Sequence, residues 1–162
     1  MKIPLSWLAE YVDTRLPPQE LADRLTLAGL EVSSFEDTGE TWRGCLIGQI
    51  LDINPHPNAD RLSLCQVNLQ DSSPTIVCGA PNISVGQKVV FAQIGAILSD
   101  PKTGERFPVR SAKIRGIVSE GILCSQKELD LGSDHTGLMI LPENAPIGSR
   151  LSTYLGDIVL EL

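Results

Sequence analysis

The segment from residue 43 to residue 150 contains short stretches in which apolar and polar residues alternate, separated by glycine-containing turns. A period of two is typical of β-strands, because successive side chains point to opposite faces. The expected strands cover residues 46–51, 61–68, 75–78, 88–94, 107–115 and 121–124. The first is apolar on both faces and contains Gly48, as in a strand that bends around a closed core. Five or six such strands predict a small β-barrel.

Ahead of the barrel segment the periodicity is helical. Ser6 is placed to cap a first helix that carries its apolar residues on one face. A second helix is expected to begin at the Pro17–Pro18 pair, where proline suits the first turn, and to end at Gly29. Residues 30–36 then predict a strand that leads through a turn into the barrel.

The chain ends in a strand-like run, residues 157–162. A terminal strand is ordered when it pairs into a sheet, so we expect this run to return and pair with the strand at residues 30–36. The same run also fits a piece of a longer chain. The predicted fold class is α+β, with the barrel of residues 43–150 inserted into a discontinuous N-terminal α/β module of residues 1–42 and 151–162.

The overall charge of −7 argues against a nucleic-acid partner, but its distribution does not. All of the excess negative charge lies in the flanks, so the segment from 43 to 150 is neutral. Within that segment five basic residues are opposed only by Glu105, and they are Lys102, Arg106, Arg110, Lys113 and Arg115. The pattern fits either cations that protect an exposed strand edge or a stripe that faces phosphates.

The alternation of this basic stretch changes phase along the expected strand. Phe107 and Val109 alternate with Arg106 and Arg110, whereas Ile114 lies between Lys113 and Arg115. We therefore expect a β-bulge near residues 111–112 that allows all of the charges to face solvent together.

Several function classes are disfavoured by composition. The N-terminus has no signal-peptide pattern, and no apolar stretch approaches the roughly 18 residues of a membrane span, so we expect a cytoplasmic protein without a membrane partner. Aromatic residues make up only 4% of the chain, which argues against single-strand binding that depends mainly on base stacking.

The cysteine and histidine patterns predict neither a metal site nor catalysis. The cysteines are far apart and form no CxxC pair, so free buried thiols are expected, although a turn near Asp71 would place Cys65 opposite Cys78 and permit an adventitious disulfide. His56 lies between prolines and His135 follows Asp134; without a nucleophile elbow, turn capping explains them better than hydrolysis.

Three strings occur in order: NPHPNADRL at 54–62, VCGAPN at 77–82 and KIRGIVSEGILCS at 113–125. Together they resemble the tRNA-binding OB-fold domain of several aminoacyl-tRNA synthetases, including the C-terminal domain of methionyl-tRNA synthetases, and of free-standing tRNA-binding proteins. The flanking strings at 2–13, 27–32, 134–137 and 141–148 resemble the N-terminus of the β subunit of bacterial phenylalanyl-tRNA synthetase. The resemblance covers the whole chain.

The resemblance implies an OB-fold inserted into the α/β module and a role without catalysis. In that family an α₂β₂ ligase activates phenylalanine with ATP and Mg²⁺ in its α subunit, and a later β-subunit domain edits mischarged tRNA. Neither catalytic part matches this chain, so no catalytic, metal or cofactor-binding residue is expected here. The implied partners are tRNA, the α subunit and the remaining β-subunit domains.

The expected tRNA contacts begin with Lys113 and Arg115, which match the basic strand of the family and flank Ile114. Further candidates, in the matching strings and the basic stretch, are Asn58, Arg61, Arg106, Arg110, Ser119, Glu120 and Ser125. Asn58 and Asp60 fit a turn-forming role equally well. Glu120 either holds Arg115 or Lys113, or bonds the backbone near Gly121.

Three other functions remain open at this point. The acidic α/β module could dock on other synthetase domains while the barrel touches little RNA. The chain could also be a free-standing tRNA-binding protein that dimerises, or an OB barrel for another ligand.

Overall fold

The computed structural model describes all residues from Met1 to Leu162, and they divide into two compact units. The first combines residues 1–40 with 155–162, and the second comprises residues 41–154. None of the helices is both long and apolar enough to cross a membrane.

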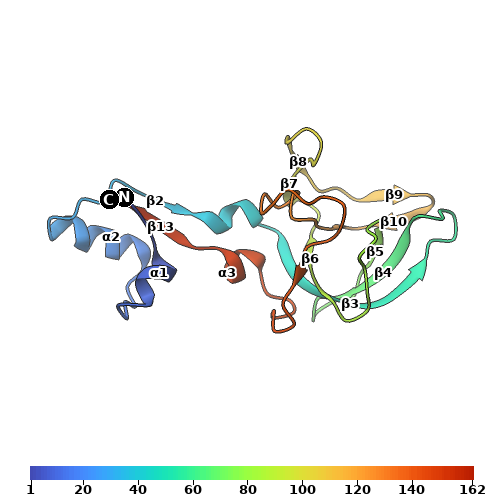
Figure 1. The fold of residues 1–162 in the computed structure, drawn as a ribbon, viewed down its shortest axis with the longest axis horizontal. Coiled ribbons are helices and arrows are strands. Elements are labelled where there is room, and N and C mark those ends of the chain that lie inside the picture. Colours follow the sequence, from blue (N-terminus) through green and yellow to red (C-terminus); the bar gives the residue numbers. More distant parts are fainter. The chain divides into compact units, whose positions relative to one another are not determined.

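The first unit is built on a three-stranded antiparallel sheet in the order β1 (Lys2–Pro4), β13 (Ile158–Glu161), β2 (Ser34–Asp37). The last strand therefore returns to pair with the strand that precedes the barrel, as predicted, although β2 begins at Ser34 and not at Leu30. The chain ends lie side by side (Figure 1), and the Met1 amino group donates a hydrogen bond of 2.8 Å to the Leu162 carbonyl oxygen.

Two helices lie between β1 and β2. Helix α2 (Pro18–Leu27) begins and ends close to the predicted positions, with Gly29 just beyond it at φ 97°. Helix α1 (Leu5–Ala9) is shorter than predicted, and Ser6 does not cap it, since its N-cap position is Pro4. The Ser6 amide and hydroxyl instead donate to the carboxylate of Asp157, because the returning strand places an acceptor there.

The second unit contains a nearly closed five-stranded antiparallel barrel with OB-fold topology. Its strands run in the order β11 (Ile122–Leu123), β6 (Lys88–Ala92), β3 (Cys45–Pro55), β4 (Ser63–Asn68), β5 (Thr75–Cys78). The first barrel strand, β3, pairs with both β4 and β6 (Figure 1), and β5 lies against β11 to close the sheet. The predicted fold class is confirmed.

Strand β3 bends where the sequence indicated. A Cβ atom on Gly48 would lie 2.5 Å from Val67 Cγ1, so only glycine allows β4 to approach this closely. The pairing of β3 with β4 then shifts register between Ile50 and Asp52, which is a β-bulge that tightens the curl. The barrel core inside this bend includes Ile50, Cys65, Val67, Ile76, Val89 and Phe91.

The remaining elements are short. Strand β12 (Ile140–Leu141) pairs with β6, and a 3-10 helix η1 (Thr38–Trp42) and helix α3 (Leu151–Leu155) complete the chain.

The single strand expected at residues 107–115 is wrong, and so is the bulge expected within it. Strand β8 (Arg106–Pro108) pairs with β7 (Ile97–Ser99), whereas β9 (Ala112–Ile114) pairs with β10 (Ile117–Ser119). Between β8 and β9 the buried Val109 exchanges backbone hydrogen bonds with Gly95 and Ala96. The chain therefore changes partner at Val109, and the basic residues are divided between two hairpins.

Candidate nucleic-acid interface

The hairpin of β9 and β10 ends in a two-residue turn made by Arg115 and Gly116. Ile114 pairs with Ile117 on either side of this turn, and both turn residues have positive φ, 51° for Arg115 and 91° for Gly116. This backbone matches the twist of a hairpin but is unusual for arginine. The Arg115 side chain is exposed at the tip of the hairpin.

The loop between β3 and β4 holds this turn. The imidazole Nε2 of His56 lies 3.0 Å from the Ile114 carbonyl oxygen, and Asn58 Nδ2 donates 3.1 Å to the carbonyl oxygen of Arg115. The loop closes on itself through a 3.0 Å hydrogen bond from the His56 amide to the Leu62 carbonyl oxygen. Figure 1 shows the loop beside the tip of the β9–β10 hairpin.

As a result, residues distant in sequence line one surface cleft of about 390 Å³, which we call the arginine cleft. Its lining residues are Asn58, Ala59, Asp60, Arg61, Leu62 and Arg115. The cleft contains two guanidinium groups against one carboxylate. Three of the residues expected to contact tRNA, Asn58, Arg61 and Arg115, are thus brought together.

The cations near this cleft are not neutralised within the chain. Arg61, Lys113 and Arg115 are exposed and form no ion pair. Lys113 pairs across the hairpin with Val118, while its neighbours Ala112 and Ile114 line a different cleft, so the lysine points to the opposite face of β9. Unpaired cations on neighbouring elements are suited to bind phosphate groups.

The second cleft, about 350 Å³, lies between β5, the β9–β10 hairpin and residues 135–138. Arg110 lines it and forms no ion pair. Ser119 and Ser125 also line it, but both are buried, and their hydroxyls are engaged. Ser119 Oγ accepts from the Val77 amide and donates to the Gly121 carbonyl, whereas Ser125 Oγ donates 2.9 Å to Glu128 Oε1.

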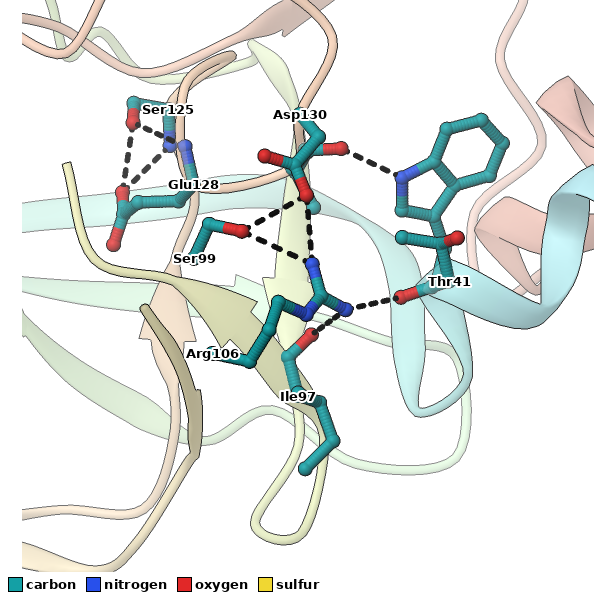
Figure 2. A network of polar contacts seen from close by, with 9 residues as sticks. Thr41, Ile97, Ser99, Arg106, Ser125, Glu128 and Asp130 are labelled. Carbon is teal, nitrogen blue, oxygen red and sulfur yellow. Dashed lines mark hydrogen bonds and ion pairs between the residues drawn. The ribbon is translucent and has the colours of Figure 1, made fainter. Parts of the chain in front are cut away.

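Arg106 lines neither cleft and lies in a network of polar contacts within the chain (Figure 2). Its Nη1 donates 2.7 Å to Asp130 Oδ2 and 3.0 Å to Ser99 Oγ, and its Nη2 donates to the carbonyl oxygens of Thr41 and Ile97. Next to Asp130, the carbonyl oxygen of Leu129 accepts a 2.8 Å hydrogen bond from the Trp42 indole. Arg106 therefore joins segments of the barrel, and the single basic stripe expected from the sequence is wrong.

Two further expectations find no counterpart. Glu120 is exposed and pairs with neither Arg115 nor Lys113. Cys65 and Cys78 are not directly opposite, since Cys65 is paired with Ile76 and Cys78 with Ser63. The register of β4 and β5 displaces the two cysteines from each other by two residues.

The four cysteines are free and buried, and their thiols contact one another in two pairs, Cys45 with Cys124 and Cys65 with Cys78. A hydrogen bond from the Cys65 thiol lowers the pKa of Cys78 to about 7, and the same contact together with burial raises the pKa of Cys65. Cys78 also lines the second cleft. No group of His, Cys, Asp and Glu side chains in the structure could hold a metal ion.

His56 is the site residue that sequence reasoning missed. The expected turn-capping role is part of its function, because His56 Nδ1 accepts the Asn58 amide. Its contact with the β9–β10 hairpin was not foreseen, because that contact depends on two loops that meet only in the folded barrel. The available signal was a histidine between two prolines within the string at 54–62 that resembles tRNA-binding domains.

Comparison with protein families gives one match that covers most of the chain. Residues 45–150 match the family described as putative tRNA binding domain. This range contains the barrel, both clefts and every residue of the arginine cleft.

Curated relatives match over the full chain. A protein named phenylalanine–tRNA ligase β subunit from Dehalococcoides mccartyi is 47% identical over all of this chain and 20% of its own length. One of the same name from Syntrophus aciditrophicus is 47% identical over 96% of this chain and 19% of its own. The chain therefore spans about a fifth of the length of these relatives. The resemblance found in the sequence is confirmed.

Among solved structures, a MetRS-related protein from Pyrococcus horikoshii aligns with a TM-score of 0.48 and 20% identity, over 66% of this chain and 87% of that one. A likeness of this strength supports no assignment.

Proposed function

Because the chain belongs to the family of putative tRNA-binding domains, we propose that it binds tRNA as a non-catalytic, N-terminal portion of a phenylalanine–tRNA ligase β subunit. The observation that carries the proposal is the arginine cleft. Two exposed guanidinium groups, unpaired within the chain, meet there although their residues lie on different loops. In this role the chain supports aminoacylation by placing the tRNA, and its partners are the α subunit and the rest of the β subunit.

The chemistry of the cleft favours contacts with the phosphate backbone. Arginine presents a planar fork of donors that suits phosphate oxygens, and Asn58 adds a polar side chain at the rim. No aromatic ring lines the cleft, so bases have no stacking surface there. We therefore propose binding that positions the RNA and carries little sequence information by itself.

The proposed contact residues follow from this geometry. Arg61, Arg115 and Asn58 line the arginine cleft, and Lys113 extends the cationic surface on the other face of the hairpin. Arg110 is a second, separate candidate at the other cleft. Ser119 and Ser125 are engaged internally, so we assign them to support of the barrel.

A salt titration tests the proposal. Each phosphate contact that is lost makes the dependence of log K on log salt shallower by about one unit, so an Arg61→Ala/Arg115→Ala chain is expected to lose about two units. Lys113→Ala alone is expected to lose about one. The matched control is Arg15→Ala/Arg24→Ala, which removes the same charge from residues that are ion-paired in the first unit.

The outcomes are distinct. A control that weakens binding as much as the cleft variant would assign the effect to general charge. Absence of tRNA binding even at low salt would contradict the proposal and favour a scaffold role.

A scaffold role is supported by one specific observation on the first unit. Trp7, Tyr11 and Leu27 expose 51%, 72% and 88% of their surface, and the rings of Trp7 and Tyr11 lie edge to face with centroids 5.7 Å apart, so these two rings form an exposed apolar patch. In a β subunit these side chains would pack against other domains. This role does not exclude tRNA binding by the barrel, and the titration above distinguishes a chain that does both from one that is only a scaffold.

A further inference from the structure

Arg115 occupies a backbone conformation that its side chain does not favour. In a hairpin turn with positive φ at both central residues, the first position is usually asparagine, aspartate or glycine. Arginine at φ 51° therefore persists only where its surroundings hold it in place. Strained positions of this kind concentrate at binding sites, where the strain fixes a side chain for its task.

Two side chains of the β3–β4 loop hold the turn at Arg115 in place. His56 contacts the Ile114 carbonyl at 3.0 Å and Asn58 donates to the next carbonyl, that of Arg115, at 3.1 Å. Consecutive peptide groups of the turn are thus fixed from outside the hairpin. The same loop carries Arg61, so these two hydrogen bonds set the position of Arg115 relative to Arg61.

The hydrogen bonds of His56 define its protonation state. Its Nδ1 accepts the Asn58 amide at 3.0 Å, so the ring proton lies on Nε2, which donates to the Ile114 carbonyl. The ring is neutral and only 5% exposed. It therefore cannot offer a charge or a free donor to RNA, and any effect on binding must pass through the turn.

We propose that His56 and Asn58 are positioning residues that hold Arg115 in its strained turn, so that its guanidinium and that of Arg61 face neighbouring phosphates of the tRNA backbone. The inference rests on the proposed function. It assigns phosphate binding to Arg61 and Arg115, and it assigns the position of Arg115 to a neutral histidine, His56.

Two substitutions of His56 separate the parts of its role. His56→Gln places an amide donor near the position of Nε2 and retains the reach to the Ile114 carbonyl. His56→Asn places an oxygen near the position of Nδ1 and keeps the Asn58 amide bonded, but it is too short to reach Ile114. The proposal expects His56→Asn to weaken tRNA binding by roughly fivefold, as the loss of one typical hydrogen bond would, and His56→Gln to stay within about twofold of the original chain.

A double-substitution cycle distinguishes positioning from support of the fold. If His56 acts through Arg115, His56→Asn has no further effect on tRNA affinity in an Arg115→Ala chain. If it merely supports the barrel, it weakens binding equally in both backgrounds, and the inference is overturned.

An NMR measurement on the unmodified chain keeps the inference testable should His56→Asn not fold. Long-range ¹H–¹⁵N correlations are expected to show the His56 proton on Nε2, and a proton on Nδ1 would overturn the inference. Failure of the unmodified chain to bind tRNA would overturn the proposed function and this inference together. Normal binding by a folded His56→Asn chain would overturn the inference alone.

Discussion

His56 Nε2 lies 3.0 Å from the carbonyl oxygen of Ile114, which joins the loop after β3 to a hairpin 58 residues further along the chain. This contact makes one surface from two loops that are separate in the sequence. It places Arg115 next to Arg61 in the arginine cleft, and it explains how an arginine is kept in a turn that suits asparagine or glycine.

The strain at Arg115 predicts a variant that gains stability and loses binding. Arg115→Asn keeps the turn, and asparagine tolerates positive φ, so the free energy of unfolding should rise by about 0.5–1 kcal/mol. The guanidinium is lost, so tRNA affinity should fall together with about one unit of salt dependence. Urea unfolding and tRNA titration measure both quantities. A variant that is less stable than the original chain would show that the arginine is not strained.

Arg106 is expected to matter for stability and not for RNA. Arg106→Ala removes the hydrogen bonds to Asp130, Ser99 and two carbonyls, and should lower the free energy of unfolding by about 0.5–1.5 kcal/mol, a modest range because the ion pair is partly exposed. The salt dependence of tRNA binding should not change.

Arg110→Ala is the matched control for the unfolding measurement on Arg106→Ala, because it removes the same charge from an exposed side chain without an ion pair. Its unfolding free energy should stay within about 0.5 kcal/mol of the original value. A shallower salt slope for Arg106→Ala would place Arg106 among the phosphate contacts after all.

Gly48 should tolerate no side chain. In Gly48→Ala the new Cβ would meet Val67 Cγ1 at 2.5 Å inside the bend of β3, and we expect a loss of about 1–3 kcal/mol in unfolding free energy. Gly79→Ala serves as the control, since its nearest neighbour is a flexible end of Leu62 at 3.2 Å. Equal losses in both variants, measured by urea unfolding, would contradict the close approach of β3 and β4.

The thiols should differ in reactivity with pH. The hydrogen bond from Cys65 lowers the pKa of Cys78 to about 7, so Cys78 becomes the reactive thiolate as the pH rises through 7, whereas Cys65 stays protonated. Alkylation followed by mass spectrometry should modify Cys78 before Cys65, with a rate that levels off above about pH 8.

Cys65→Ala tests the cause of that shift. It removes the donor, so the midpoint of Cys78 alkylation should move to higher pH. An unchanged midpoint would mean that the thiol pair does not set the reactivity of Cys78.

Much of the fold was predictable because its signals are local. The alternation of residues 46–51 and 61–68, the Pro17–Pro18 helix start and the glycine bend at Gly48 each depend on neighbours in sequence, and the structure contains all of them. The strand at the chain end could also be paired with β2, because an isolated strand needs a partner. The predicted cap at Ser6 is wrong because the helix begins one residue earlier, at Leu5, and the Ser6 amide and hydroxyl donate to a distant carboxylate, that of Asp157.

The sequence by itself determined a β-barrel inserted into an α/β module, and a set of cations within a tRNA-binding pattern. Only the tertiary structure decided which of those cations act together. Arg106 belongs to the basic stretch but forms an ion pair with Asp130, while the distant Arg61 lines the same cleft as Arg115. The physical reason is that strand periodicity governs which face a side chain takes, whereas its neighbours depend on hydrogen bonds between remote loops, here those of His56 and Asn58 to the turn at Arg115.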